Sequence, residues 1–202
     1  MTKVKICGLS RLEDIEMVNR WLPDYIGFVF AKSRRQVNAL TASQLKERLN
    51  PKIIAVGVFV DQEMDVILQL VDNKVIEMVQ LHGSEDETYV RRLKELTQIP
   101  VIKAVAVSGK QSIKGSVADY LLFDGEKAGS GQVFDWNHLT DIEIPYFLAG
   151  GLNVDNIPQA LSKKPFALDV SSGVEVNGVK DEEKIRRFIE LVRKQQGVLK
   201  NE

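Results

Sequence analysis

The chain of 202 residues contains a single cysteine, Cys7, so no disulfide can form within it. A protein without internal disulfides fits a reducing compartment, and we expect a cytoplasmic location. The chain also lacks a basic and then apolar leader at its start, and it has no apolar run of membrane-spanning length. Its formal net charge is only -1, which gives no electrostatic reason to expect nucleic acid or a membrane as a partner.

Low-complexity tracts and linker-like segments are also absent, and the six prolines are scattered. We therefore predict one domain that spans residues 1–202. A chain of this length can bury roughly 70% of the surface that its unfolded form exposes, so its core needs no disulfide or metal to hold it together.

Short apolar runs rich in valine, isoleucine and phenylalanine alternate with longer amphipathic stretches. The runs span residues 4–7, 25–30, 53–60, 75–81, 101–107, 120–124, 146–150 and 166–170. This alternation is typical of the α/β class, in which helices cover a parallel sheet. An open doubly wound sheet usually has about five or six strands. Eight runs therefore favour a (β/α)8 barrel, the TIM barrel.

Capping residues predict where several helices begin. Ser10 with Glu13, and Ser84 with Glu87, have the spacing of a capping box, and Thr41 opens another helical stretch. The stretch 181–194 places four apolar side chains on one helical face, namely Ile185, Phe188, Ile189 and Val192. The patterns in 108–119 and 128–141 are weaker, and we do not expect complete helices there.

Polar, reactive or glycine-rich residues follow nearly every predicted strand. The carboxyl ends of barrel strands carry the chemistry in this fold, so the pattern predicts an enzyme or a ligand-binding barrel with its site on one face. Three of the loops are rich in glycine and serine, which lets backbone N–H groups approach an anion. We predict that these loops bind phosphate through Gly129, Ser130, Gly131, Gly150, Gly151, Asn153, Ser171, Ser172 and Gly173. The alternative is that their glycines only form tight turns.

The order of these motifs resembles the phosphoribosylanthranilate isomerase family. The matching stretches are "KICG", "GFVFAKSRR", "VGVFVD", "VQLHG", "LLFD", "GSGQVFDW", "LAGGLN" and "DVSSGVE", and they cover essentially the whole chain. The resemblance implies an Amadori rearrangement of N-(5-phosphoribosyl)anthranilate to 1-(2-carboxyphenylamino)-1-deoxyribulose 5-phosphate, in tryptophan biosynthesis, with no metal and no cofactor. The family often has Gly-Gly where this chain has Ala128 and Gly129, and the segment from Asp124 to Gly129 is short.

The resemblance implies that Cys7 is the general base and Asp124 the general acid. From the residues alone, Cys7 is equally a small buried side chain, and Asp124 is equally a helix cap. A carboxyl group after an apolar strand is partly desolvated, and we expect this to raise the pKa of Asp124. A free thiol is a weak base unless its thiolate is stabilised, so we hypothesise that an interior lysine, Lys5 or Lys103, lowers the pKa of Cys7 and pairs with an acid such as Asp169.

Three further residues are candidates for substrate binding. Arg35, the second arginine of "SRR", suits a bidentate carboxylate, whereas Arg34 is expected to face solvent. His82 either contacts substrate or makes a structural hydrogen bond. Asp169 either binds the anthranilate amine or neutralises a lysine.

Two rival functions differ from this interpretation. One is another phosphate-binding barrel such as indole-glycerol-phosphate synthase, whose pattern relies on lysine and glutamate at strand ends. The other is a non-catalytic metabolite-binding barrel, which would have no need of Cys7 and Asp124. We expect a phosphorylated small molecule as the partner, and the chain to be a monomer or a homodimer.

Overall fold

The computed structural model describes residues 1–125 and 133–198. Three residues of the predicted phosphate site, Gly129, Ser130 and Gly131, lie outside the described residues.

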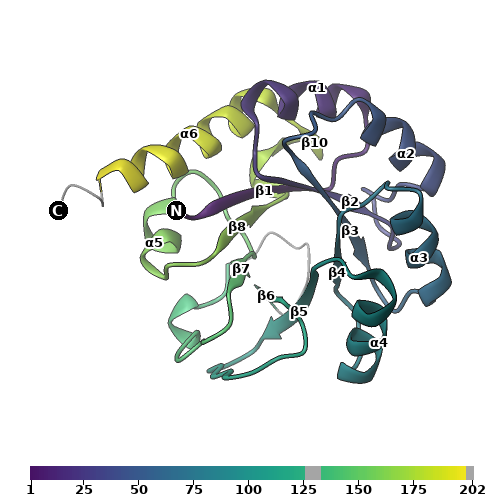
Figure 1. Ribbon diagram of the computed structural model, residues 1–202. Helices are drawn as coiled ribbons and strands as arrows, with labels where there is room; N and C mark the ends of the chain where they lie inside the picture. The colour runs from purple at the N-terminus through teal and green to yellow at the C-terminus, as the bar shows by residue number, and fades with distance from the viewer. Residues whose placement is uncertain (126–132, 199–202) are drawn as a thin grey trace.

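Eight parallel strands close into a barrel in chain order, as Figure 1 shows. The strands are β1 (Lys3–Cys7), β2 (Tyr25–Val29), β3 (Ile54–Phe59), β4 (Met78–Leu81), β5 (Val101–Val107), β6 (Tyr120–Gly125), β7 (Tyr146–Leu148) and β8 (Ala167–Val170). Each predicted apolar run overlaps one of them, so the predicted TIM barrel is confirmed. The run 75–81 forms a strand only from Met78 onward, and the run 146–150 only as far as Leu148.

Helices surround most of the barrel but not all of it. They are α1 (Leu12–Trp21), α2 (Ala39–Glu47), α3 (Met64–Asp72), α4 (Glu87–Thr97), α5 (Ile157–Ser162) and α6 (Glu182–Val198). Between β5 and β7 the only helical element in the described part of the chain is the 3-10 turn η1 (Trp136–His138), which follows β6. Loops therefore cover this side of the barrel in Figure 1, where the sequence patterns were weak.

The predicted helix starts were wrong by up to three residues. Helix α1 begins at Leu12, because the Asp14 carboxylate accepts the backbone N–H groups of Ser10 and Arg11 at 3.0 and 3.1 Å. Ser84 does not cap α4, since its N–H and hydroxyl both donate to Asp61 Oδ1.

Two other caps come from residues that were not predicted. Asp86 caps α4 by accepting the N–H of Tyr89, and Asn38 caps α2 by accepting the N–H of Thr41. An oxygen of the capping side chain meets an unsatisfied N–H of the first turn in each case.

Two layers of apolar side chains form the core. The smaller group fills the barrel and draws on seven strands or their ends, with Tyr25, Val56, Met78, Ile102, Leu122, Phe147, Ala149 and Ala167. The larger group packs between the strands and the helices. Helix α6 contributes the four residues that were predicted to share a face, and all four are buried.

The chain after β8 adds a small antiparallel hairpin. The 3-10 turn η2 (Ser172–Val174) leads into β9 (Glu175–Val176), which pairs with β10 (Val179–Lys180) so that Lys180 lies opposite Glu175. Within the described residues, no helix is both long enough and apolar enough to cross a membrane.

Replacing Phe188 by alanine tests how much α6 contributes to the core. The side chain is fully buried, so the Phe188→Ala variant should lower the free energy of unfolding in urea by about 3–5 kcal/mol. The neighbouring Arg187 is exposed, so Arg187→Ala should change it by less than about 0.5 kcal/mol. Equal effects of the two changes would contradict the packing described for this helix.

Candidate active site

A cavity of about 400 Å³ opens at the carboxyl ends of the barrel strands. This volume lies in the range of small-molecule sites. Its walls are formed by Cys7, Val29, Ala31, Lys32, Ser33, Arg35, Val58, Val60, Gln80, His82, Leu122, Asp124, Ala149, Gly150, Gly151, Leu152, Asp169, Ser171 and Ser172. The structure therefore brings together all five residues predicted for catalysis and substrate binding: Cys7, Arg35, His82, Asp124 and Asp169.

Cys7 ends β1, and two glycines make room around it. Gly27 is its neighbour on β2, where an added Cβ would lie 2.7 Å from the Cys7 sulfur. Gly8 has a φ of +80°, and a Cβ there would lie 2.3 Å from Cδ of Arg35. Glycine at position 8 thus permits both the backbone turn and the passage of the Arg35 side chain into the cavity.

Lys5 lies below Cys7 on β1 and is fully buried. Its ammonium donates to Asp169 Oδ2 at 2.8 Å, as hypothesised. Burial works against the charged form, but the net effect of its surroundings, led by the charge of Asp169, raises the pKa of Lys5. Lys5 therefore carries its positive charge at neutral pH. Lys103 instead donates to Gly83 O and Glu85 Oε2.

The hypothesis of a lowered thiol pKa was wrong in its net direction. Burial is the largest influence and raises the pKa of Cys7, while the charges of Lys5 and Lys180 lower it without cancelling the effect of burial. Part of the residue remains exposed to the cavity, yet the dense surroundings of the sulfur hydrate a thiolate poorly. Cys7 is therefore a protonated thiol at neutral pH in the unliganded protein.

Asp124 ends the apolar part of β6 and faces His82. Its Oδ1 accepts the N–H of Gly125 at 2.8 Å, and its Oδ2 lies 3.8 Å from Nε2 of His82. Burial and the charge of Lys5 lower the pKa of His82, so the imidazole is neutral at neutral pH. Nδ1 of His82 is 2.9 Å from Nε2 of Gln80. His82 thus both lines the cavity and makes a structural hydrogen bond.

Arg35 lines the cavity, but its guanidinium already has a carboxylate partner. Its Nε and Nη2 donate to the two oxygens of Glu175 at 2.7 and 2.9 Å. Arg34 donates to the same carboxylate at 2.7 Å, although 57% of its side chain is exposed. The expectation that Arg34 faces solvent holds for most of the side chain and fails for its tip.

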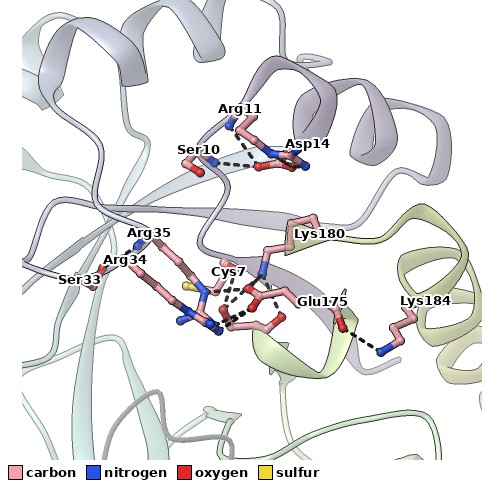
Figure 2. A network of polar contacts seen from close by, with 11 residues as sticks. Cys7, Ser10, Arg11, Asp14, Ser33, Arg34, Arg35, Glu175, Lys180 and Lys184 are labelled. Atoms are coloured by element: carbon pink, nitrogen blue, oxygen red, sulfur yellow. Dashed lines mark hydrogen bonds and ion pairs between the residues drawn. The ribbon is translucent and has the colours of Figure 1, made fainter. Parts of the chain in front are cut away.

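Lys180 completes the group of cations around Glu175. Its buried ammonium donates to Glu175 Oε1 at 2.8 Å and to Ser171 O at 2.9 Å. The hydroxyl of Ser171 in turn donates to the backbone oxygen of Cys7 at 3.0 Å. Figure 2 shows Arg34, Arg35 and Lys180 converging on Glu175 beside Cys7.

Burial affects the titration of both members of the Glu175–Lys180 pair. It favours the neutral form of Glu175, but hydrogen bonds from Arg35 and Lys180 outweigh it and hold the pKa of Glu175 below its ordinary value. Burial lowers the pKa of Lys180, although Glu175 acts in the opposite direction. Glu175 is therefore ionised at neutral pH.

Asp169 has one oxygen engaged and one available. Oδ2 accepts from Lys5, whereas Oδ1 is buried without a hydrogen-bond partner among the described residues. Oε1 of Gln80 is likewise buried without a hydrogen-bond partner among the described residues, and both residues line the cavity. A buried acceptor without a donor is costly, so these two atoms are suited to receive N–H or O–H groups from a ligand.

The loops after β7 and β8 form another wall of the cavity. Gly150 and Gly151 have φ values of +79° and +65°. Their backbone N–H groups, within the part of the chain that the structure describes, donate to no other group. Ser171 and Ser172 lie beside them. The loops therefore offer free N–H donors, as the predicted phosphate site requires.

Asn153 and Gly173 are not among the described residues that line the cavity. Asn153 Oδ1 accepts the N–H of Asp155, and its N–H donates to Asn156 Oδ1, so it shapes the loop after β7. A Cβ at Gly173 would lie 1.8 Å from the backbone oxygen of Leu152, so glycine there lets the two loops touch. Their part in phosphate binding stays a prediction.

Sequence reasoning missed Glu175, Lys180 and Gln80. Glu175 and Gln80 fall within the quoted stretches "DVSSGVE" and "VQLHG", so their positions beside the site were visible although no role was inferred. Lys180 had no comparable signal, because its contact with Glu175 depends on the hairpin formed by β9 and β10.

Comparison with known proteins decides the family. A family model described as N-(5'phosphoribosyl)anthranilate (PRA) isomerase matches residues 4–191. The chain belongs to this family. N-(5'-phosphoribosyl)anthranilate isomerase from Endomicrobium trichonymphae is 48% identical over 198 residues, which cover 96% of this chain and 99% of the relative. The expected activity class is confirmed, and the chain is an aldose–ketose isomerase.

Solved structures agree with this membership. Phosphoribosyl anthranilate isomerase from Thermus thermophilus is 33% identical, with a TM-score of 0.88, over 96% of this chain and 100% of that chain. A second isomerase, solved with reduced 1-(o-carboxyphenylamino)-1-deoxyribulose 5-phosphate, is 33% identical with a TM-score of 0.78, over the same shares of the two chains.

Alkylation of the thiol tests the electrostatics of this isomerase site. Cys7 is the sole cysteine, so mass spectrometry of iodoacetamide-treated protein reports on it alone. Because burial raises the pKa of Cys7, the thiolate forms only at high pH. The alkylation rate should still be rising above about pH 8.5, where an ordinary thiol is half ionised.

Two lysine variants distinguish the influence of Lys5. Lys5→Met removes a charge that lowers the pKa of Cys7, so the rise should shift to still higher pH. Lys3 lies on the same strand but pairs with Asp24, so Lys3→Met should leave the profile unchanged. A rate that levels off below pH 8.5 in the unaltered protein, or identical profiles for both variants, would refute this description.

Proposed function

We propose that this chain catalyses the Amadori rearrangement of N-(5'-phosphoribosyl)anthranilate with Cys7 as general base and Asp124 as general acid. The observation that carries the proposal is the composition of the cavity at the carboxyl ends of the strands. It holds a thiol from β1, a carboxyl group from β6, a guanidinium and free backbone N–H groups. The substrate has a carboxylate at one end, a phosphate at the other and the reacting sugar carbons between them.

The reaction needs an acid and a base in sequence. Asp124 protonates the ring oxygen, the bond from C1 to that oxygen breaks, and a protonated Schiff base forms. The Cys7 thiolate then removes the proton from C2, and the electron pair of that bond gives an enolamine. Return of a proton to C1 and loss of the proton from the C2 hydroxyl yield the ketose, so no atom is gained or lost.

The raised pKa of Cys7 has two opposite consequences for a base. It keeps the thiolate population small at neutral pH, and it makes each thiolate a stronger proton acceptor. Lys5 supports the reactive form because its charge lies under the sulfur and favours the thiolate. In the proposed mechanism Lys5 is therefore a positioning charge, while the thiol itself touches the substrate.

The substrate would be oriented by two different anion sites. The planar guanidinium of Arg35 suits the anthranilate carboxylate, and the N–H groups of Gly150 and Gly151 suit the phosphate. The free oxygen of Asp169 would accept the anilino N–H between these ends. With its two ends held in this way, the substrate would have sugar carbons C1 and C2 next to Cys7 and Asp124.

Removing either proposed catalytic group should reduce turnover without unfolding the protein. We expect Cys7→Ala and Asp124→Asn each to lower kcat on the order of 10²–10⁴-fold, which is typical of losing a positioned acid or base. Asp135 is an exposed aspartate that caps η1, and Asp135→Asn should keep nearly full activity. Product formation with purified substrate is the measurement, with circular dichroism as the check of folding.

Growth of a tryptophan auxotroph that lacks the isomerase tests the assignment independently. The unaltered chain should restore growth, and both catalytic variants should fail to do so. No rescue by the unaltered chain would favour one of the rival barrel functions. Normal kcat in Cys7→Ala would instead remove the thiol from the mechanism.

Placing a negative charge in the loop after β8 tests the proposed phosphate site. Ser172→Asp puts a carboxylate against the wall where the phosphate would lie, so KM should rise about tenfold or more through like-charge repulsion. The value of kcat should change by less than about threefold, because the phosphate does not react. Ser162 is exposed at the end of α5, and Ser162→Asp should leave both constants unchanged.

A further inference from the structure

The carboxylate of Glu175 carries more positive partners than one negative charge can balance. Arg34, Arg35 and Lys180 all donate to it, and only 4% of the Glu175 side chain is exposed. The cluster therefore keeps an excess of positive charge at the edge of the cavity. A second anion at this place would offset part of this excess.

Glu175 occupies only one edge of the Arg35 guanidinium. The two hydrogen bonds come from Nε and Nη2, which form the side edge of the planar group. Nη1 has no hydrogen-bond partner within residues 1–125 and 133–198. A guanidinium can bind two carboxylates in its plane, one at each edge. The end edge, formed by Nη1 and Nη2, is thus left for a ligand in the cavity that Arg35 lines.

Lys180 holds the Glu175 carboxylate in place and connects it to β1, the strand that carries Cys7. Its side chain is 2% exposed, and it bridges Glu175 Oε1 and the backbone oxygen of Ser171. Ser171 then donates to the backbone oxygen of Cys7. The direction of the guanidinium is therefore set relative to the thiol through a short chain of hydrogen bonds rather than by the flexible arginine side chain.

We propose that Glu175 is a positioning residue, which with Lys180 turns the free edge of Arg35 toward the substrate carboxylate. This inference rests on the proposed function, because it presumes that Arg35 receives the anthranilate carboxylate. The alternative is that the Glu175–Lys180 pair only fastens the hairpin of β9 and β10, in which the two residues lie opposite each other. A fastening role would weaken the binding of every ligand equally.

Two ligands that differ only in the carboxylate separate these roles. The probes are reduced 1-(o-carboxyphenylamino)-1-deoxyribulose 5-phosphate and the same compound with a phenyl group in place of the carboxyphenyl group. Calorimetry gives the ratio of their Kd values for each variant. We expect the unaltered protein to bind the carboxylate form about tenfold or more tightly, as a charge-assisted pair of hydrogen bonds allows.

Glu175→Gln should abolish most of this preference while the Kd of the phenyl compound changes little. Glu175→Asp keeps the charge but withdraws it by one methylene group, so it should also reduce the preference. Arg186→Gln is the matched control, since Arg186 also pairs with glutamates but lies on α6 and does not line the cavity, and this variant should retain the full preference. In steady-state kinetics, Glu175→Gln should raise KM more than it lowers kcat.

In the Glu175→Gln variant the buried ammonium of Lys180 loses its carboxylate partner, and this loss threatens folding. The double variant Glu175→Gln with Lys180→Met removes both charges and keeps the hairpin neutral. It should fold and still lack the preference for the carboxylate compound. An unchanged preference in either the single or the double variant would overturn the proposal, as would an equal loss of affinity for both compounds.

The same titrations distinguish failure of this inference from failure of the proposed function. An unaltered protein that binds neither compound would refute the isomerase site itself. An unaltered protein that binds both equally well would refute the role of Arg35 and Glu175 while leaving Cys7 and Asp124 in place.

Discussion

Pairing of β1 with β8 is the interaction on which the site depends, because it closes the barrel. It brings together residues that are 164 positions apart, placing Lys5 against Asp169 and the backbone oxygen of Cys7 against the Ser171 hydroxyl. The thiol, the carboxylate of Asp169 and one loop of the proposed phosphate site meet only through this closure. An open sheet with the same strands would leave Cys7 and Ser171 on opposite edges. The chemistry is therefore a property of the closed barrel and not of any one loop.

Competition between burial and charge decides the protonation state of Lys5 and of Cys7, which both lie on β1 beside β8. For Lys5 the surroundings, led by the charge of Asp169, outweigh burial, and the ammonium stays charged. For Cys7 burial outweighs the charges of Lys5 and Lys180, and the thiol stays neutral. The two groups lie close together on one strand, yet the charged surroundings taken together have the larger effect on the pKa of Lys5 and burial has the larger effect on the pKa of Cys7. The charge of Asp169, whose carboxylate accepts from Lys5 at 2.8 Å, accounts for most of the difference, because it favours the ammonium and disfavours the thiolate.

The sequence predicted most of the fold and the membership of the cavity, because both follow from local patterns. Apolar runs indicated all eight strands, and polar residues after them indicated the site, since parallel strands end at one rim. The net pKa of Cys7 could not be predicted, because it depends on how tightly distant elements pack around the sulfur. The contact between Glu175 and Lys180 could not be predicted for a similar reason. Their meeting requires a hairpin whose two strands are only two residues long each, too short to leave a pattern.

The unequal chemistry of the two proposed anion sites implies a single direction of substrate binding. A guanidinium offers a flat pair of donors, which matches a planar carboxylate, while the backbone N–H groups of Gly150 and Gly151 suit a tetrahedral phosphate. Reversing the substrate would put the phosphate against Arg35, where Glu175 already occupies one edge and leaves only a flat pair of donors, which matches a tetrahedral phosphate less well than a planar carboxylate. It would also separate the anilino nitrogen from the free oxygen of Asp169. Glu175 therefore favours one orientation through geometry, because it limits Arg35 to a planar pair of donors, and a cluster with excess positive charge can in this way still select between two anions.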